Sequence, residues 1–216
     1  MSDHLWRDLL AHGTRHTYEA REVLVHQGDA GHQVAVIQEG RVKITRAEVN
    51  GVEALLAVRG AGELVGETAV IEGEDSPVTV TALRPCQASL FTPSQFAALL
   101  GGSELALPVL RYAVSRRAEA DEIRAELSLL PVSLRLVRML LRFIDAAGAP
   151  VRAGAHVDLE MTQEDLARAI GASRSQVAAT LAGLRRRGVL STGRRRLIVR
   201  DHTVLQAIGA GRFAVR

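Results

Sequence analysis

Two short segments near the end of the chain combine helix-capping residues with side chains that can hydrogen-bond to DNA. Thr162 opens a T-x-x-D pattern and Ser173 opens an S-x-x-Q pattern, and both patterns are typical of helix N-termini. Gly171 lies between the two expected helices, which predicts a helix-turn-helix whose second helix enters the major groove of DNA. The side chains that this arrangement would turn toward DNA are those of Thr162, Ser173, Arg174, Ser175, Gln176, Ala179 and Thr180.

The chemistry of these side chains suits both bases and phosphates. Arg174 can bridge O6 and N7 of guanine, and Gln176 can pair with N6 and N7 of adenine. Ser173 begins a helix with free backbone N–H groups, a place that suits a phosphate oxygen. These residues predict sequence-specific binding to double-stranded DNA.

The segment after the second helix changes to the period of strands. Val189-Leu190 and Leu197–Val199 are apolar and flank a glycine-containing turn, which predicts a hairpin. A hairpin directly behind a helix-turn-helix is the wing of a winged helix, and its basic tip could neutralise phosphates. The alternative is that two helices and a hairpin pack as a small α+β domain with no DNA function. The basic residues at and before the tip are Arg194, Arg195 and Arg196, and Arg185 to Arg187.

Charge is distributed unevenly along the 216 residues. The formal net charge is +3, but residues 1–130 carry −6 and residues 131–216 carry +9, with 15 arginines and no lysine in the second part. A basic C-terminal third on an acidic body favours a nucleic-acid-binding module attached to another domain. A solvated basic surface is the alternative.

The first hundred residues are typical of an all-β domain. Short apolar segments between residues 14 and 92 are separated by glycine-rich turns and leave no room for crossover helices. This spacing predicts an antiparallel sandwich or barrel of the jelly-roll type. Pro93 opens a short helix, which Gly101-Gly102 ends.

A long helix is predicted from Ser103 to Leu130, because this segment contains no glycine and its one proline lies near the start. Its narrow stripe of medium-sized residues fits a two-stranded coiled coil and therefore a homodimer. The alternative is that the stripe covers the chain's own β-domain. Pro131 marks the boundary, so the predicted parts are a sensor domain (1–102), a dimerisation helix (103–130) and a DNA-binding domain (131–216). The stripe consists of Val109, Ala113, Arg116, Ala120, Ile123 and Leu127.

Composition excludes several classes of protein. With 47% hydrophobic and 24% charged residues the chain is a globular protein, and it has no apolar run long enough to cross a membrane. The polar start lacks an apolar leader segment, so we expect a cytoplasmic protein. Cys86 is the single cysteine, which excludes an internal disulfide and an all-cysteine metal site. The histidines show no ligand spacing, so we expect no cofactor and no enzyme of the metal-binding cupin type.

The order of β-domain, long helix and winged helix resembles the family of the cAMP receptor protein and the fumarate-nitrate regulator (Crp/Fnr). The resemblance implies an α+β fold with an N-terminal antiparallel jelly roll of the cyclic-nucleotide-binding type, a dimerisation helix and a C-terminal winged helix-turn-helix. It also implies a homodimer that binds a palindromic operator and recruits or blocks RNA polymerase. The matching residues are Gly28-Asp29, Gly40 to Lys43, Gly62 to Glu67 and Ile170 to Arg174.

The resemblance fails at the expected effector pocket. In members that bind cyclic nucleotides, a Glu takes the ribose hydroxyl and an Arg-Ser pair about ten residues later takes the phosphate. Gly66 and Glu67 are kept here, but Ser76 and Pro77 occupy the Arg-Ser positions, and they offer no cation. On the long helix, the positions that meet adenine fall on Ala120 and Asp121, which lack the family's hydroxyl pair. We therefore expect that cAMP binds weakly or is not the effector, and that Glu67 either contacts a ligand or caps a turn.

The recognition helix also departs from the family. Members that read a TGTGA-like half-site carry Arg-Glu near the helix start and a further Arg five residues after the first, where this chain has Arg174, Ser175 and Ala179. The operator should keep a guanine contact and differ elsewhere. The leading hypothesis is a homodimeric transcription regulator that performs no chemistry, with an unknown effector or none. The alternative is a sensor of another small molecule, bound in an apolar pocket under Val65, Val70, Ile71 and Val78.

Overall fold

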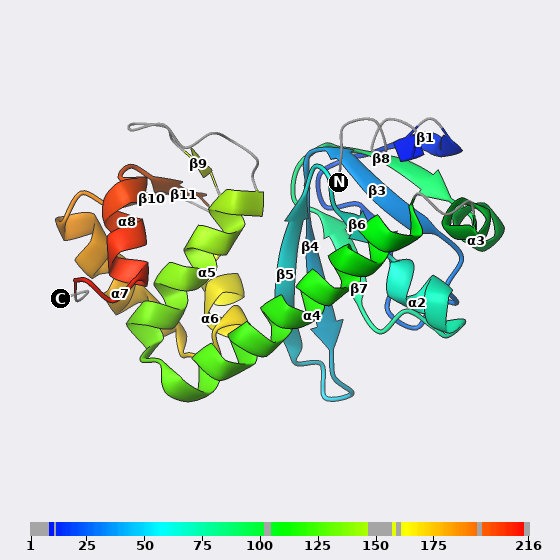
Figure 1. Cartoon of the computed structure of the whole chain (residues 1–216). Coiled ribbons are helices and arrows are strands. Elements are labelled where there is room, and N and C mark those ends of the chain that lie inside the picture. Colours follow the sequence, from blue (N-terminus) through cyan, green and yellow to red (C-terminus); the bar gives the residue numbers. More distant parts are fainter. Residues whose placement is uncertain are drawn as a thin grey trace. The chain divides into compact units, whose positions relative to one another are not determined.

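The computed structural model describes residues 9–10, 12–101, 105–146, 157–158, 161–193 and 196–213 (Figure 1). The chain divides into two compact units. The first contains the residues up to Ala47 together with Arg59–Arg124, and the second contains Glu48–Val58 together with the chain from Ala125 onward.

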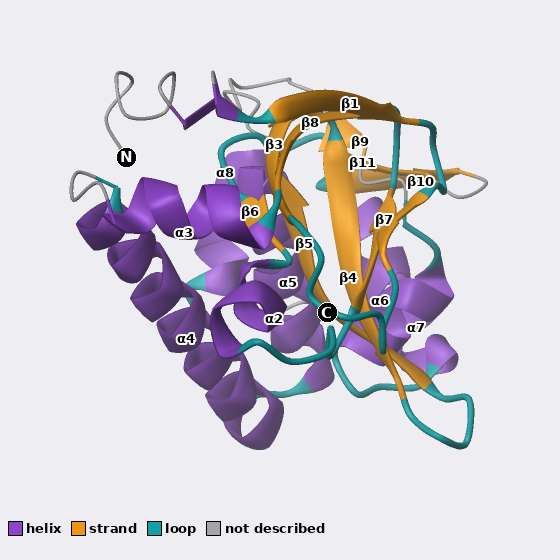
Figure 2. Ribbon diagram, turned by 90° about the vertical axis from the view of Figure 1, so that its right-hand side faces the viewer, coloured by secondary structure: helices purple, strands orange, loops and turns teal. Residues whose placement is uncertain are grey.

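Two four-stranded antiparallel sheets form the β-domain (Figure 2), which confirms the predicted jelly-roll class as two open sheets rather than a closed barrel. The first sheet has the order β1 (Thr14–Tyr18), β8 (Cys86–Phe91), β3 (Val34–Glu39) and β6 (Leu64–Val65). The second has the order β2 (Val23–Val25), β7 (Thr79–Ala82), β4 (Arg41–Ala47) and β5 (Glu53–Gly60).

Strand β3 is buried on both faces, which explains its unbroken apolar run. Ala35 and Ile37 belong to a cluster with residues of the second sheet, such as Val42 and Val80. Val34 and Val36 belong to a second cluster that extends into the helical segments beside the sheet. Since successive side chains of a strand point to opposite faces, a strand between two apolar layers needs no polar alternation. The second cluster contains Leu9, Leu64, Phe91, Phe96, Leu105 and Val109.

Among the helices beside the sheets are α2 (Glu67–Glu72), α3 (Pro93–Gly101) and α4 (Ala106–Leu129). The break after Gly101 and the long helix agree with the sequence, but α2 was not predicted. Gly66 and Gly73 bound α2 with positive φ angles of 84° and 70°. A Cβ on Gly66 would lie 2.6 Å from the Gln33 carbonyl oxygen, so this turn requires glycine. Ile71 lies exposed on α2 and does not line an apolar pocket, which corrects the expectation for that side chain.

The predicted stripe of α4 is divided between two environments. Val109 is buried in the apolar cluster of its own β-domain, and Arg116 bonds to Glu63 at 2.8 Å, so these two residues follow the alternative of intrachain packing. Ala113, Ala120 and Leu127 are exposed, and Ile123 is half-buried. Large apolar side chains are exposed on a different part of the helix surface, at Leu107, Leu110 and Val114.

The second unit contains the helices and the small sheet of the predicted winged helix-turn-helix. Its helices are α5 (Val132–Ala146), α6 (Gln163–Ala169), α7 (Arg174–Arg186) and α8 (His202–Gly209), and α8 was not predicted. Its antiparallel sheet has the order β10 (Leu190–Gly193), β11 (Arg196–Val199) and β9 (Val157–Asp158). The core is supplied by the apolar face of α5, with Leu136, Val137, Leu140 and Ile144, and by Leu166, Val177, Leu181 and Leu184.

No single helix in the described ranges is long and apolar enough to cross a membrane. The consecutive pair α3 and α4 passes that test jointly, by length and composition, but is bent by 112°.

A buried carboxylate joins the end of α4 to α5. Glu126 is 4% exposed, and its two oxygens accept hydrogen bonds from Nη1 and Nη2 of Arg142, each at 2.9 Å. Arg138 donates to the same carboxylate at 3.4 Å and, through Nε, to the carbonyl oxygen of Gly209 at the end of α8. Glu126 and Arg138 together therefore link α4, α5 and α8.

We expect the substitution Glu126→Gln to lower the free energy of unfolding by about 2–3 kcal/mol, because it leaves two arginines without a carboxylate. Urea unfolding followed by circular dichroism measures this change. Glu122→Gln, an exposed site on the same helix, is the control and should stay within about 0.5 kcal/mol of the wild type. Equal effects of the two substitutions would show that the buried cluster does not stabilise the fold.

Candidate nucleic-acid interface

The first helix of the helix-turn-helix begins and ends as the sequence predicts. The Thr162 hydroxyl accepts from the Asp165 N–H at 3.0 Å, and Asp165 Oδ2 accepts from the Thr162 N–H at 3.0 Å, which completes a capping box. After Ile170 the chain turns at Gly171, whose φ is +57°. This left-handed conformation favours glycine and directs the chain into the second helix.

A second capping box fixes the start of α7. Ser173 Oγ accepts from the Gln176 N–H at 3.2 Å, and Gln176 Oε1 accepts from the Ser173 N–H at 2.9 Å. The carboxamide oxygen of Gln176 also lies 3.1 Å from Ser173 Oγ. Pairing with adenine uses both ends of a carboxamide, so Gln176 cannot form it while it caps the helix. The structure therefore gives Gln176 a role in positioning the helix, and its predicted pairing with adenine stays a prediction.

The remaining side chains of α7 divide into a buried and an outward face. Val177, Leu181 and Leu184 are buried, as the helical stripe predicts. Thr180 is also buried, at 9% exposure, and its hydroxyl donates to the Gln176 carbonyl oxygen at 3.0 Å. The expectation that Thr180 is exposed to DNA is therefore wrong. In the first two turns Arg174, Ser175, Gln176 and Ala179 are exposed and Ala178 is partly exposed, as is Ala182 in the following turn.

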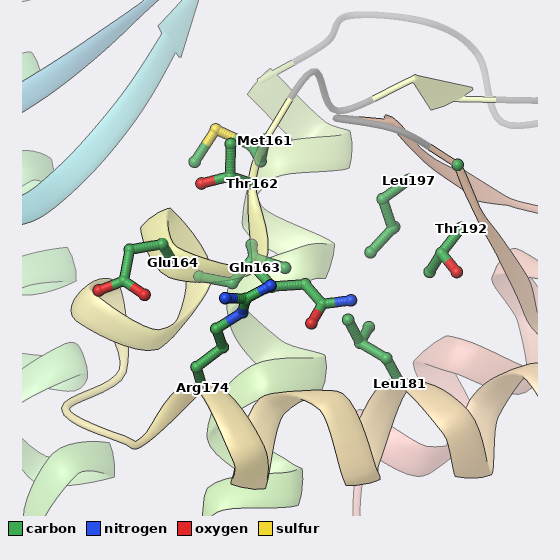
Figure 3. A pocket seen from close by; sticks show the side chains of 10 residues that line it. Met161, Thr162, Gln163, Glu164, Arg174, Leu181, Thr192 and Leu197 are labelled. Atoms are coloured by element: carbon green, nitrogen blue, oxygen red, sulfur yellow. The ribbon is translucent and has the colours of Figure 1, made fainter.

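A hollow of about 430 Å³ lies between the first turn of α6, the start of α7 and strands of the wing. Figure 3 shows the Arg174 side chain extending from α7 toward Gln163 and Thr162 of α6. Thr192 of β10 lies on another side of this hollow (Figure 3), and Gly193 also lines it. The fold thus gathers Thr162, Arg174 and the wing around one concave surface.

The wing is present where the sequence predicts it. Strands β10 and β11 pair from Leu190↔Val199 to Gly193↔Arg196. Arg185 donates to the Thr192 hydroxyl at 3.1 Å and thereby ties α7 to the wing. Arg194 and Arg195 lie outside the described residues, and Arg196 is described only as part of β11.

The expected effector pocket is a small hollow of about 90 Å³ in the β-domain. Gly66 and Ser76 line it, whereas Glu67, Pro77 and Asp121 do not. Ser76 is buried and its hydroxyl donates to the Val78 carbonyl oxygen at 2.8 Å, while its N–H donates to the Asp29 carbonyl oxygen at 2.7 Å. The loop that would hold a phosphate is therefore bonded to its own chain.

Glu67 and Asp121, the two carboxylates that the sequence predicts in this pocket, do not line it. Burial raises the pKa of Glu67, and the opposing effects of its own N–H and of Arg59 and Arg116 are smaller. Asp121 is half-exposed and pairs with Arg117 and Arg124 of its own helix, each at 3.0 Å.

A charge network between the β-domain and α4 was missed by the sequence reasoning. Arg59 pairs with Glu119 at 2.9 Å, and Arg116 bridges Glu63 at 2.8 Å and Glu119 at 3.0 Å. Tyr112 donates from its hydroxyl to the Leu64 carbonyl oxygen at 3.0 Å. The only sequence signals of this network are the i,i+4 pair Arg59 and Glu63 and the i,i+3 pair Arg116 and Glu119. No sequence pattern connects the two pairs.

Comparison with known proteins agrees with this arrangement. A model of the cyclic nucleotide-binding domain matches residues 15–102, and a model of the Crp-like helix-turn-helix domain matches residues 134–208. The cyclic AMP receptor protein of Thermus thermophilus is 24% identical over 203 residues, which cover 94% of this chain and 91% of that protein. The global nitrogen regulator of Nostoc sp. is 26% identical over 194 residues, which cover 88% of this chain and 86% of that protein.

Solved structures share the fold. A CRP/FNR-family transcriptional regulator from Thermus thermophilus has a TM-score of 0.76 at 21% identity, and the match covers 93% of this chain and 100% of that one. Together these findings define the class: a protein that carries a cyclic-nucleotide-binding-type β-domain and a winged helix-turn-helix on one chain. The chain belongs to the Crp/Fnr family of DNA-binding transcription regulators.

Proposed function

We propose that this protein is a homodimeric, sequence-specific transcription regulator that acts without cAMP. The observation that carries the DNA-binding part is the outward face of α7, a helix capped at Ser173, which begins with Arg174 and Ser175 and contains no acidic side chain. Arg174 offers a guanidinium to a base edge, and Ser175 offers a hydroxyl group. We further propose three functional parts at 1–102, 103–130 and 131–216, with RNA polymerase as the partner of the DNA-bound dimer.

The proposed contacts follow from the capping geometry. Arg174 reads guanine, and Ser175 offers a short hydroxyl to a neighbouring base edge. The first-turn N–H groups of Arg174 and Ser175 have no acceptor within the helix and bind a phosphate, together with Ser173. Thr162 and the wing arginines Arg194, Arg195 and Arg196 hold the DNA backbone.

Substitution Arg174→Ala should weaken binding to the selected operator by about 1–3 kcal/mol, the value of one bidentate base contact. Binding to random duplex DNA should change far less, because phosphate contacts dominate it. Fluorescence anisotropy with labelled duplexes measures both affinities. Arg15→Ala, which removes an exposed arginine of the β-domain, is the control, and an equal loss with both substitutions would contradict base reading by Arg174.

The dimer is supported by the apolar side chains that α4 leaves exposed. Leu107, Leu110 and Val114 are 52%, 59% and 61% exposed and recur at helical spacing. The same face of a second α4 would cover them in a two-stranded arrangement. This face replaces the predicted one at Val109 and Arg116, which the chain's own β-domain uses. Two recognition helices would then meet half-sites about one helical turn apart.

The substitution Val114→Glu should convert the dimer to a monomer, because it places a charge in an apolar interface. Sedimentation velocity measures the mass, and Ile71→Glu, at a similarly exposed site on α2, is the control. A wild-type monomer, or a dimer that survives Val114→Glu, would contradict this interface.

Independence from cAMP is supported by the size and lining of the small hollow. A volume of about 90 Å³ is far below the roughly 300 Å³ at which ligand pockets begin. Its lining has no lysine or arginine, so the free energy of burying a cyclic phosphate would be unfavourable. The Thermus relative is named for cyclic AMP, but Ser76 and Pro77 stand here in place of the Arg-Ser pair that the family resemblance implies for phosphate binding.

Calorimetric titration of the full-length protein with cAMP and with cGMP should show no saturable heat, and neither nucleotide should change operator affinity. The physical reasons are that no lysine or arginine lines the small hollow and that the Ser76 N–H is already bonded to the Asp29 carbonyl oxygen. Saturable binding of cAMP in the micromolar range, with a rise in DNA affinity, would contradict the account.

A further inference from the structure

The second turn of the recognition helix presents methyl groups where polar side chains would be expected. Ala179 is exposed, and its neighbours on the outward face, Ala178 and Ala182, are partly exposed. The two polar residues of this stretch are used internally, since Gln176 caps the helix and Thr180 bonds to the helix backbone. Beyond Arg174, Ser175 and the capping side chain of Gln176, the first two turns of α7 therefore offer mainly apolar contact.

An alanine methyl group discriminates between bases in two ways. It packs against apolar base atoms, and it leaves polar base atoms without a hydrogen-bond partner. Thymine presents a 5-methyl group in the major groove, and two methyl groups in contact remove apolar surface from water. Guanine and cytosine present polar atoms there, and a methyl group pressed against them would leave those atoms without partners. The short side chain also lets the helix backbone approach the bases closely. This surface therefore favours thymine.

We propose that Ala179 is a specificity-determining residue that reads a thymine through its 5-methyl group. The proposal rests on the proposed function, because it requires α7 to lie in the major groove. Arg174 and Ala179 are five residues apart, or about 7.5 Å along the helix axis. Since base pairs are spaced at about 3.4 Å, the thymine should lie about two base pairs from the guanine that Arg174 reads.

The test replaces single thymines of the selected operator by uracil, which removes only the 5-methyl group. For the wild-type protein, uracil at the thymine two pairs from the guanine should lower affinity about fourfold, the value for one buried methyl group. In Ala179→Gly the ratio of affinities for thymine and uracil at that position should fall to about one. The affinities for the thymine and uracil operators are compared within one protein, so the general cost of glycine in a helix affects both and cancels in their ratio.

Ala98→Gly is the control, because it places glycine at an exposed position of α3, a helix that has no part in the proposed DNA contacts. Its thymine-to-uracil ratio at that position should equal that of the wild type, and circular dichroism should show that both variants fold. A ratio near one at every thymine for the wild type, or a ratio unchanged by Ala179→Gly, would overturn the inference. Failure of the wild-type protein to bind any selected duplex would instead overturn the proposed function.

Discussion

The C-terminal unit that carries the recognition helix is built around a buried ionic cluster at the point where α4 meets α5. Glu126 accepts two hydrogen bonds from Arg142 and one from Arg138, and Arg138 also holds the carbonyl oxygen at the end of α8. A Cβ on Gly171 would lie 3.8 Å from Leu127, so the turn between α6 and α7 lies against the residue that follows Glu126. A charge buried this deeply is tolerated only with its partners in place. The cluster therefore ties the end of the long helix to α5 and α8, close to the turn that leads into α7.

Within the helix-turn-helix, several side chains that could contact DNA are used to build the helix. Gln176 closes the cap with Ser173, and Thr180 bonds to the backbone of its own helix. These interactions fix the start of α7, where Arg174 and Gln176 are both exposed and Gln176 is engaged in the cap. Under the proposed function, specificity then rests on few groups, one guanidinium and a surface of small residues, which makes the shape of the groove as important as its hydrogen bonds.

Much of this architecture could be predicted from local chemistry. Gly171 and Ser173 mark the turn and the cap, and the change of period after Gly188 marks the wing, because each signal depends on neighbouring residues alone. The faces of α4 could not be assigned in the same way. That helix is apolar on more than one side, and only the tertiary fold shows that Val109 is covered while Val114 is exposed. The charge network of Arg59 and Glu119 joins residues 60 positions apart, so no local pattern could reveal it.

The most direct test of the account is selection of bound sequences from a random duplex library by the full-length protein, with no nucleotide added. The account predicts an inverted repeat whose half-sites each contain a guanine and whose centres lie about 10–11 base pairs apart or a multiple of that distance. Enrichment of this repeat would show that a symmetric dimer reads DNA without an effector. A single unrepeated site, or no enrichment unless a cyclic nucleotide is added, would contradict it.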